Sequence, residues 1–232
     1  MTRVRLGSEE RRRAIVAAAV PLFARNGFAG TTTKEIARGA GVSEALLFQH
    51  FPSKVALYEA IVAQGCLGDP DLQKLAALPP STATLVRMTR LMLEHLVLGA
   101  LGDPVERDIR HRLTLNSLLH DGVYARHVFA WVTDEVLPLF RASLEAAARA
   151  GDLVPGARFS INDFWFGEHV AAMMAYVRLP GRSALAYQGE EDEVMEQALL
   201  FILRGLGLRE TAIDRHLDAD AASVPNDEPV PA

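Results

Sequence analysis

The sequence is poor in the residues that build cross-linked or metal-stabilised folds. Cys66 is the only cysteine in 232 residues, which excludes a disulfide scaffold and zinc sites made of paired cysteines. The histidines do not follow a metal-binding spacing such as H-E-x-x-H. Neither a Gly-rich phosphate loop, a Ser-His-Asp set nor a paired-carboxylate pattern stands out. We therefore expect a protein without metal, cofactor or enzymatic activity.

Long apolar runs are also missing. No stretch approaches the roughly 18–20 apolar residues that span a bilayer. Residues 14–24 follow three arginines as in a signal peptide, but the segment is short, contains Pro21 and lacks a small-residue cleavage site. Half of the residues are nevertheless hydrophobic, which is enough to build a folded core. The sequence thus predicts a cytosolic protein, with one domain or two small ones and no membrane partner.

Strand-like alternation is scarce, and apolar residues recur instead at the three- and four-residue steps of helices. An all-α fold is the expected class. Pro21 and Pro138 fall inside predicted helices, where each is expected to cause a kink. The predicted helices cover a segment from Ser8 to about residue 25, then 34–40, 44–50, 54–64, 81–100, 104–120, 123–150, 161–178 and 190–208.

Charge is unevenly distributed along the chain. Residues 1–55 carry nine basic and four acidic side chains, a net charge of +5, whereas the remainder carries 15 basic and 25 acidic ones, a net charge of −10. A basic end on an acidic body indicates a polyanionic partner, although charge can also segregate by chance. We expect a basic N-terminal module over 8–64, a helical body over 65–217 and a disordered tail over 218–232.

The two short predicted helices form the most informative pattern. Residues 40–43, A-G-V-S, join them with the spacing of a helix-turn-helix. Gly41 permits the positive φ that a sharp turn needs, and Ser43 caps the second helix. The N-terminus of that helix could then enter a major groove about 12 Å wide. An ordinary helical hairpin remains the alternative reading of this pattern.

A denser set of positions resembles the N-terminal domain of TetR/AcrR transcriptional regulators. This resemblance implies a homodimer that binds a palindromic DNA operator, usually as a repressor. It also implies a small molecule that binds the C-terminal helical domain and lowers the affinity for the operator. The matching positions are Ile15, Ala18, Ala19, Leu22, Phe23, Gly27, Thr31, Thr32, Ile36, Ala37, Ala40, Gly41, Val42, Ser43, Leu47, Phe48, His50, Phe51, Lys54 and Leu57.

Matching positions also suggest which residues touch DNA, with the helix-turn-helix spanning 32–51. Gln49 is the best base reader by type, because its amide suits adenine. Lys54 resembles a phosphate-contacting lysine of the family, while a solvated surface role remains the alternative for each position. The expected contacts are Thr32, Thr33, Ser43, Glu44, Ala45, Gln49, His50 and Lys54, with Arg3, Arg5 and Arg11 as a flexible arm.

Three departures from the family pattern make the operator hard to predict. Phe48 stands where tyrosine is usual, so a phosphate-bonding hydroxyl is absent, and Ala45 replaces a common glycine. Glu44 brings negative charge to the DNA. It could accept a hydrogen bond from cytosine N4, or it could simply repel phosphate.

The predicted body offers apolar, methionine-containing walls that suit a hydrophobic or aromatic effector, although each residue could equally fill the core. The last two predicted helices, 161–178 and 190–208, are expected to form the dimer surface. The second of these helices has an apolar stripe of Val194, Ala198, Leu199, Ile202 and Leu206. The candidate ligand-binding residues are Met88, Met92, His95, Phe129, Phe140, Trp165 and Met173.

The sequence therefore predicts a dimeric repressor that a small molecule releases from its operator. An activator or a corepressor-dependent regulator on the same fold is the first alternative. A helical small-molecule carrier or enzyme that has lost DNA binding is the second.

Overall fold

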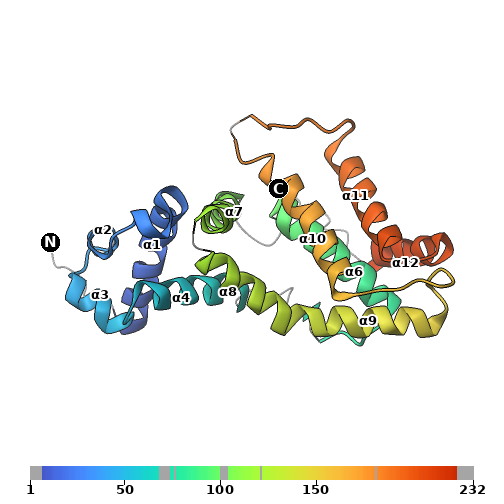
Figure 1. Ribbon diagram of the computed structural model, residues 1–232, viewed down its shortest axis with the longest axis horizontal. Helices are drawn as coiled ribbons and strands as arrows, with labels where there is room; N and C mark the ends of the chain where they lie inside the picture. The colour runs from blue at the N-terminus through green and yellow to red at the C-terminus, as the bar shows by residue number, and fades with distance from the viewer. Residues whose placement is uncertain are drawn as a thin grey trace, which may run out of the picture. The chain divides into compact units, whose positions relative to one another are not determined.

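The computed structural model describes residues 7–67, 74–75, 77–99, 104–120, 122–180 and 182–223 (Figure 1). The regular structure of these residues is helical, apart from an isolated antiparallel bridge between Leu153 and Leu208. The expected all-α class is confirmed. None of the helices formed by these residues has both the length and the apolar character needed to cross a membrane. Arg3, Arg5 and the end of the predicted tail, 224–232, lie outside the described residues.

Contacts divide the chain into two units, which we describe separately. The first unit contains residues 1–73 and 101–132, and the second contains residues 74–100 and 133–232. The sequence had suggested a single boundary after residue 64. Instead, two helices from the middle of the chain, within 104–131, belong to the first unit.

The first unit is built around the N-terminal helix and a stack of aromatic rings. The ring of Tyr58 lies 4.3 Å from that of Phe23 and 4.7 Å from that of Phe28, measured between centroids. Such stacked rings bury large apolar areas and fix the spacing of the helices that carry them. The helices of this unit are α1 (Ser8–Gly30), α2 (Thr33–Gly39), α3 (Glu44–His50), α4 (Lys54–Leu67), α7 (Pro104–Leu119) and α8 (Val123–Trp131).

Helix α1 is interrupted near its end by a glycine and not by its proline. Gly27 has φ 68° and ψ 179°, values that an L side chain rarely adopts, so the last turn to Gly30 takes a new direction. The sequence had predicted that the helix stops near Gly27, and the break confirms that position. The kink expected at Pro21 is not where the backbone departs from helical geometry.

The second unit packs its helices around α6, which contacts α9, α10, α11 and α12. Ser81 caps α6 as predicted, because its hydroxyl accepts a hydrogen bond from the Thr84 amide at 3.0 Å. The helices of this unit are α6 (Thr82–Leu93), the π-helical η1 (Glu94–Leu98), α9 (Leu137–Ala150), α10 (Ile161–Tyr176), α11 (Glu191–Gly205) and α12 (Glu210–Ser223).

Buried Asp152 joins the start of α6 to α12. Its carboxylate accepts hydrogen bonds from Thr82 Oγ1 at 2.7 Å and from Arg215 Nη1 at 3.2 Å, and His216 Nε2 lies 3.7 Å away. Burial by itself would raise the pKa of Asp152. The hydrogen bonds and the nearby positive charges outweigh it, so this pKa lies below its ordinary value.

Two helix predictions need correction. The segment 123–150 is not one helix, because the π-helical turn η2 (Val132–Val136) separates α8 from α9, and Pro138 falls in the first turn of α9. Helix α12 was not predicted. Residues 218–223, where we predicted disorder, continue α12 as helix.

Candidate nucleic-acid interface

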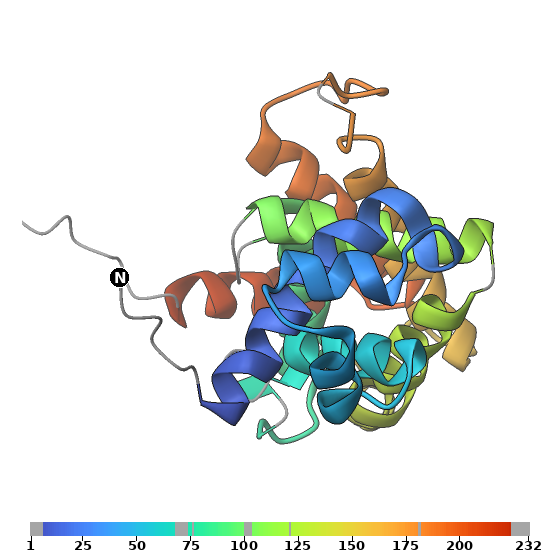
Figure 2. The ribbon, with the colours of Figure 1, turned by 90° about the vertical axis from the view of Figure 1, so that its left-hand side faces the viewer.

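Helices α2 and α3 form a compact pair held by a tight turn and by apolar inner faces. Gly41 has φ 67°, as its predicted role in the turn requires, and the Val42 amide donates to the Ala37 carbonyl at 2.9 Å. Ile36, Ala37 and Leu47 are buried in the core of the first unit. Figure 2 is turned so that α2 and α3, in blue, face the viewer. The pair therefore has the arrangement of a helix-turn-helix.

The start of α2 is closed by a reciprocal cap. Thr32 Oγ1 accepts from the Glu35 amide at 3.2 Å and donates to Glu35 Oε2 at 2.8 Å, and the Thr32 amide donates to the same oxygen at 2.9 Å. Both hydrogen bonds that Thr32 donates to the Glu35 carboxylate lower the pKa of Glu35, and the bond from the backbone amide has the larger effect. The Thr32 hydroxyl, predicted to contact phosphate, is thus used by the cap in the free protein.

Helix α3 exposes one face of mixed chemistry. Ser43 caps the helix by accepting from the Leu46 amide at 3.2 Å. Glu44, Ala45 and Gln49 are exposed, so three of the predicted base readers share this face, whereas His50 is half-buried. Phe48 is 46% exposed on the same face. We had not counted Phe48 as a contact, although its position four residues after Glu44 places it there.

Two of the predicted DNA contacts are bonded to each other. Thr33, the first residue of α2, donates its hydroxyl hydrogen to Glu44 Oε1 at 2.7 Å. Glu44 is the first residue of α3, so the bond links the starts of the two short helices. Its carboxylate is consequently held at the surface of the pair and does not rotate freely.

Lys54 has an internal role that the sequence did not reveal. Its ammonium donates to the carbonyl of Phe28 at 2.6 Å and to that of Thr31 at 2.9 Å, and lies 4.2 Å from the centroid of the Phe28 ring. Lys54 therefore ties the start of α4 to the residues that connect α1 with α2. Its direct contact with phosphate stays a prediction.

The arginines near the start of α1 contribute to packing as well as to charge. The guanidinium carbon of Arg12 lies 4.7 Å from the centroid of the buried Phe51 ring, a cation–π arrangement. Arg11, the one predicted arm residue within the described part, is half-buried. The residues that sequence reasoning missed here are Phe48 and Arg12.

The predicted ligand-binding residues are distributed over helices of both units, and their role stays a prediction. Phe140 and Trp165 each meet Phe164 edge to face, with centroids 5.1 and 5.3 Å apart, so these rings lie together in the second unit. Phe129 belongs to α8 in the first unit. Met173 is 58% exposed on the outer face of α10. The three remaining candidates lie on α6 and η1, where Met88 is buried and Met92 and His95 are half-buried.

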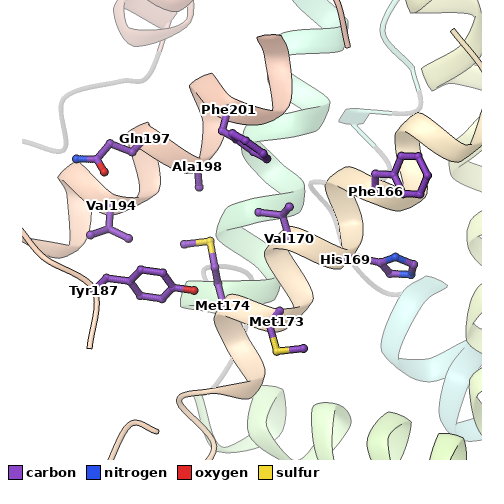
Figure 3. A pocket seen from close by; sticks show the side chains of 10 residues that line it. All are labelled: Phe166, His169, Val170, Met173, Met174, Tyr187, Val194, Gln197, Ala198 and Phe201. Carbon is purple, nitrogen blue, oxygen red and sulfur yellow. The ribbon is translucent and has the colours of Figure 1, made fainter. Parts of the chain in front are cut away.

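A shallow apolar cavity of about 540 Å³ lies on the outer face of α10 and α11 (Figure 3). Phe166 is 64% exposed, Phe201 is 66% exposed, and Met173 also lines the cavity. Two residues of the stripe predicted for the dimer surface, Val194 and Ala198, also line this cavity. The members of the stripe, Val194, Ala198, Leu199, Ile202 and Leu206, are buried in the second unit, where they cover neighbouring helices.

Helices α10 and α11 approach each other closely at Gly167. A methyl group at this position would lie 3.0 Å from Ile202 Cγ2 on α11 and 3.6 Å from Met92 Cε on α6. Only a residue without a side chain fits this approach without displacing a neighbour.

Glu168, the next residue of α10, is half-buried and carries a carboxyl group with one buried oxygen. Its Oε2 atom is inaccessible, lacks a hydrogen-bond partner and lies 3.6 Å from Nε2 of exposed His169. Desolvation raises the pKa of Glu168 to about 7. The pKa of Tyr176 is raised to about 12, mainly by burial and to a smaller extent by the charge of Glu168. Over the described residues, no three His, Cys, Asp or Glu side chains gather to hold a metal ion.

Helix α3 is short, is capped by Ser43 and packs with Leu47 on the core of the first unit, while its other face is exposed. This arrangement is typical of helix-turn-helix DNA-binding domains. Residues 15–61 match the family model described as bacterial regulatory proteins, tetR family. The N-terminal domain therefore belongs to the TetR family, which confirms the resemblance seen in the sequence.

Similar proteins share this domain or this fold. The HTH-type transcriptional regulator RutR of Escherichia coli is 46% identical over 54 residues, 23% of this chain and 26% of RutR. The HTH-type transcriptional activator FasR of Mycolicibacterium smegmatis is 43% identical over 58 residues, 25% of this chain and 26% of FasR. The match thus spans about a quarter of these curated relatives.

A solved structure extends the similarity beyond the N-terminal domain. NalD, the secondary repressor of the MexAB-OprM multidrug efflux pump in Pseudomonas aeruginosa, has a TM-score of 0.64 and 22% identity. The superposition covers 88% of this chain and 98% of NalD. At this identity the likeness establishes the fold of the chain and nothing about its ligands.

Proposed function

We propose that this protein is a transcriptional regulator that binds double-stranded operator DNA as a homodimer and acts as a repressor. The observation that carries the proposal is the exposed face of α3, with Glu44, Ala45, Phe48 and Gln49 displayed on a helix whose opposite face is buried. Amide, carboxylate and apolar side chains together can distinguish base edges in the major groove. The basic N-terminal segment supplies attraction to the phosphates.

The outer face of α10 and α11 supports the homodimer. Phe166, Met173 and Phe201 expose large apolar side chains beside the cavity of Figure 3, and such a patch is typical of an interface. A second copy of the chain would cover it about a two-fold axis. Two recognition helices would then read half-sites about 34–36 Å apart, which implies a palindromic operator.

A small hydrophobic or aromatic effector would act through the second unit. The rings of Phe140, Phe164 and Trp165, with the methionines of α6, provide the apolar surroundings that such a molecule needs. Binding would favour a conformation in which the two recognition helices no longer match successive major grooves. A coupling of about 1–3 kcal/mol would change operator occupancy substantially.

DNA binding is tested by fluorescence anisotropy on duplexes from the region upstream of the gene. We expect binding that weakens steeply with salt, because phosphate contacts release counterions. Gln49→Ala should reduce affinity for the operator about tenfold, since a good contact to a base edge contributes on the order of 1–3 kcal/mol. Gln188→Ala, at an exposed position outside the proposed DNA-binding face, is the matched control and should leave affinity unchanged.

Two further outcomes would revise the proposal. If the protein binds no duplex at low salt, the proposed DNA-binding function is wrong. A reporter gene whose expression falls when the regulator is deleted would show activation in place of repression. The effector is sought by thermal-shift screening of apolar and aromatic compounds, followed by anisotropy with each compound that stabilises the protein.

A further inference from the structure

The carboxylate of Glu44 is held in place on the surface that faces DNA in the proposed function. Thr33 Oγ1 donates to Glu44 Oε1 at 2.7 Å, although the two residues are eleven positions apart in the chain. Because Ser43 caps α3 immediately before Glu44, the backbone at this point is also fixed. The bond commits Oε1 and leaves Oε2 available as a hydrogen-bond acceptor.

A fixed carboxylate on such a surface has a definite chemical preference. It repels phosphates, so it lowers affinity for every duplex alike. On base edges it can only accept hydrogen bonds, and the donor that carboxylates typically use in the major groove is the N4 amino group of cytosine. The O6 and N7 atoms of guanine are acceptors, which a carboxylate repels.

We propose that Glu44 is a specificity-determining residue that reads cytosine in each half-site, and that Thr33 is the positioning residue for its carboxylate. The inference rests on the proposed DNA-binding function and adds the identity of one base that is read. The Thr33 hydroxyl thereby acts within the protein, on Glu44, in place of the phosphate contact that the sequence suggested.

The opposing explanation is that the bond merely fastens α2 to α3. Fastening would affect stability and affinity for all operators equally, whereas positioning affects one base position. Base preference at that position therefore separates the two roles, and affinity alone does not.

The test is selection of operators from a random duplex pool by the full-length wild-type protein and by Glu44→Gln, Thr33→Val and Thr33→Ser. Wild-type protein should prefer cytosine at one position of each half-site, about fivefold to tenfold for a single contact to a base edge. Glu44→Gln should lose that preference, with a shift toward adenine, and keep all others. Thr33→Val should weaken the same preference, and Thr33→Ser, which retains the hydroxyl, should keep it.

Other results would overturn the inference. Unchanged base preference in Glu44→Gln, with tighter binding to all duplexes, would mean that Glu44 only repels phosphate. If Thr33→Val keeps the wild-type preference for cytosine, Thr33 does not position the carboxylate. The same conclusion follows if the double variant Thr33→Val with Glu44→Gln loses more base preference than Glu44→Gln alone. If the wild-type protein enriches no duplex, the proposed function fails as well, an outcome distinct from enrichment without cytosine preference.

Discussion

Replacing Glu168 by glutamine should stabilise the protein at neutral and alkaline pH. Burial raises the pKa of Glu168 from 4.5 to about 7, so the folded protein binds this proton more tightly than the unfolded chain does. The contribution of Glu168 to the free energy of unfolding should therefore be fully present below about pH 4.5 and should be lost as the pH rises to about 7. Above the folded pKa this contribution no longer changes.

The magnitude follows from the size of the pKa change. A difference of about 2.5 pKa units corresponds to about 3 kcal/mol of lost stability once both states are ionised. Glu168→Gln removes the ionisation and nearly preserves the volume. The variant should exceed the wild type by up to about 3 kcal/mol at pH 8, less the cost of burying the amide, and should lose this advantage near pH 5.

The assay is urea denaturation at pH 5, 6, 7 and 8, with equal protein concentrations because association contributes to apparent stability. His169→Gln is the control, since Nε2 of the exposed His169 lies 3.6 Å from the carboxylate of Glu168. The pH-dependent decrease should persist in this variant. Parallel curves for Glu168→Gln and the wild type would refute the assignment of the decrease to Glu168.

Three further predictions concern single contacts. Lys54→Met should reduce the free energy of unfolding by about 2 kcal/mol in urea titrations, because two carbonyls lose a charged donor. Asp152→Asn should cost about 1–2 kcal/mol at pH 7 and less below pH 3, where protonation removes the same interactions from the wild type. Phe201→Glu should give monomers in sedimentation experiments, whereas Leu119→Glu, at a still more exposed position of the first unit, should not.

Each of these has a contrary outcome. Wild-type stability in Lys54→Met, together with weaker DNA binding, would make this lysine a phosphate contact only. If Asp152→Asn lowers the free energy of unfolding by the same amount from pH 7 to pH 2, the loss of stability comes from altered packing and not from the lost charge. A dimeric Phe201→Glu variant would place the interface elsewhere.

Local signals predicted the helix-turn-helix well. The caps of α2 and α3, the glycine turn and the apolar spacing act within a few residues, so the observed Glu44–His50 helix coincides with the predicted one. Contacts between distant segments were out of reach. The bonds of Lys54 to the end of α1, and the inclusion of residues 101–132 in the first unit, depend on tertiary packing.

The body illustrates why periodicity does not identify a surface. Val194 and Leu199 lie on an apolar stripe, and the same pattern fits a partner chain or the core of the chain itself. In the structure Leu199 is buried in the core, Val194 is buried at the wall of the cavity in Figure 3, and Phe201 is exposed. Methionines and aromatic residues likewise indicate apolar surroundings without showing which of them contact one another, so the ligand-binding residues stay a prediction.

The glycine between α10 and α11 has a consequence for assembly. Because a methyl group at Gly167 would lie 3.0 Å from Ile202 Cγ2, a larger residue there would require Ile202 or the backbone of α11 to shift. In the proposed dimer, a buried position of the protomer would thus influence the geometry of pairing. Two such proteins could share every outward side chain and still associate at different angles.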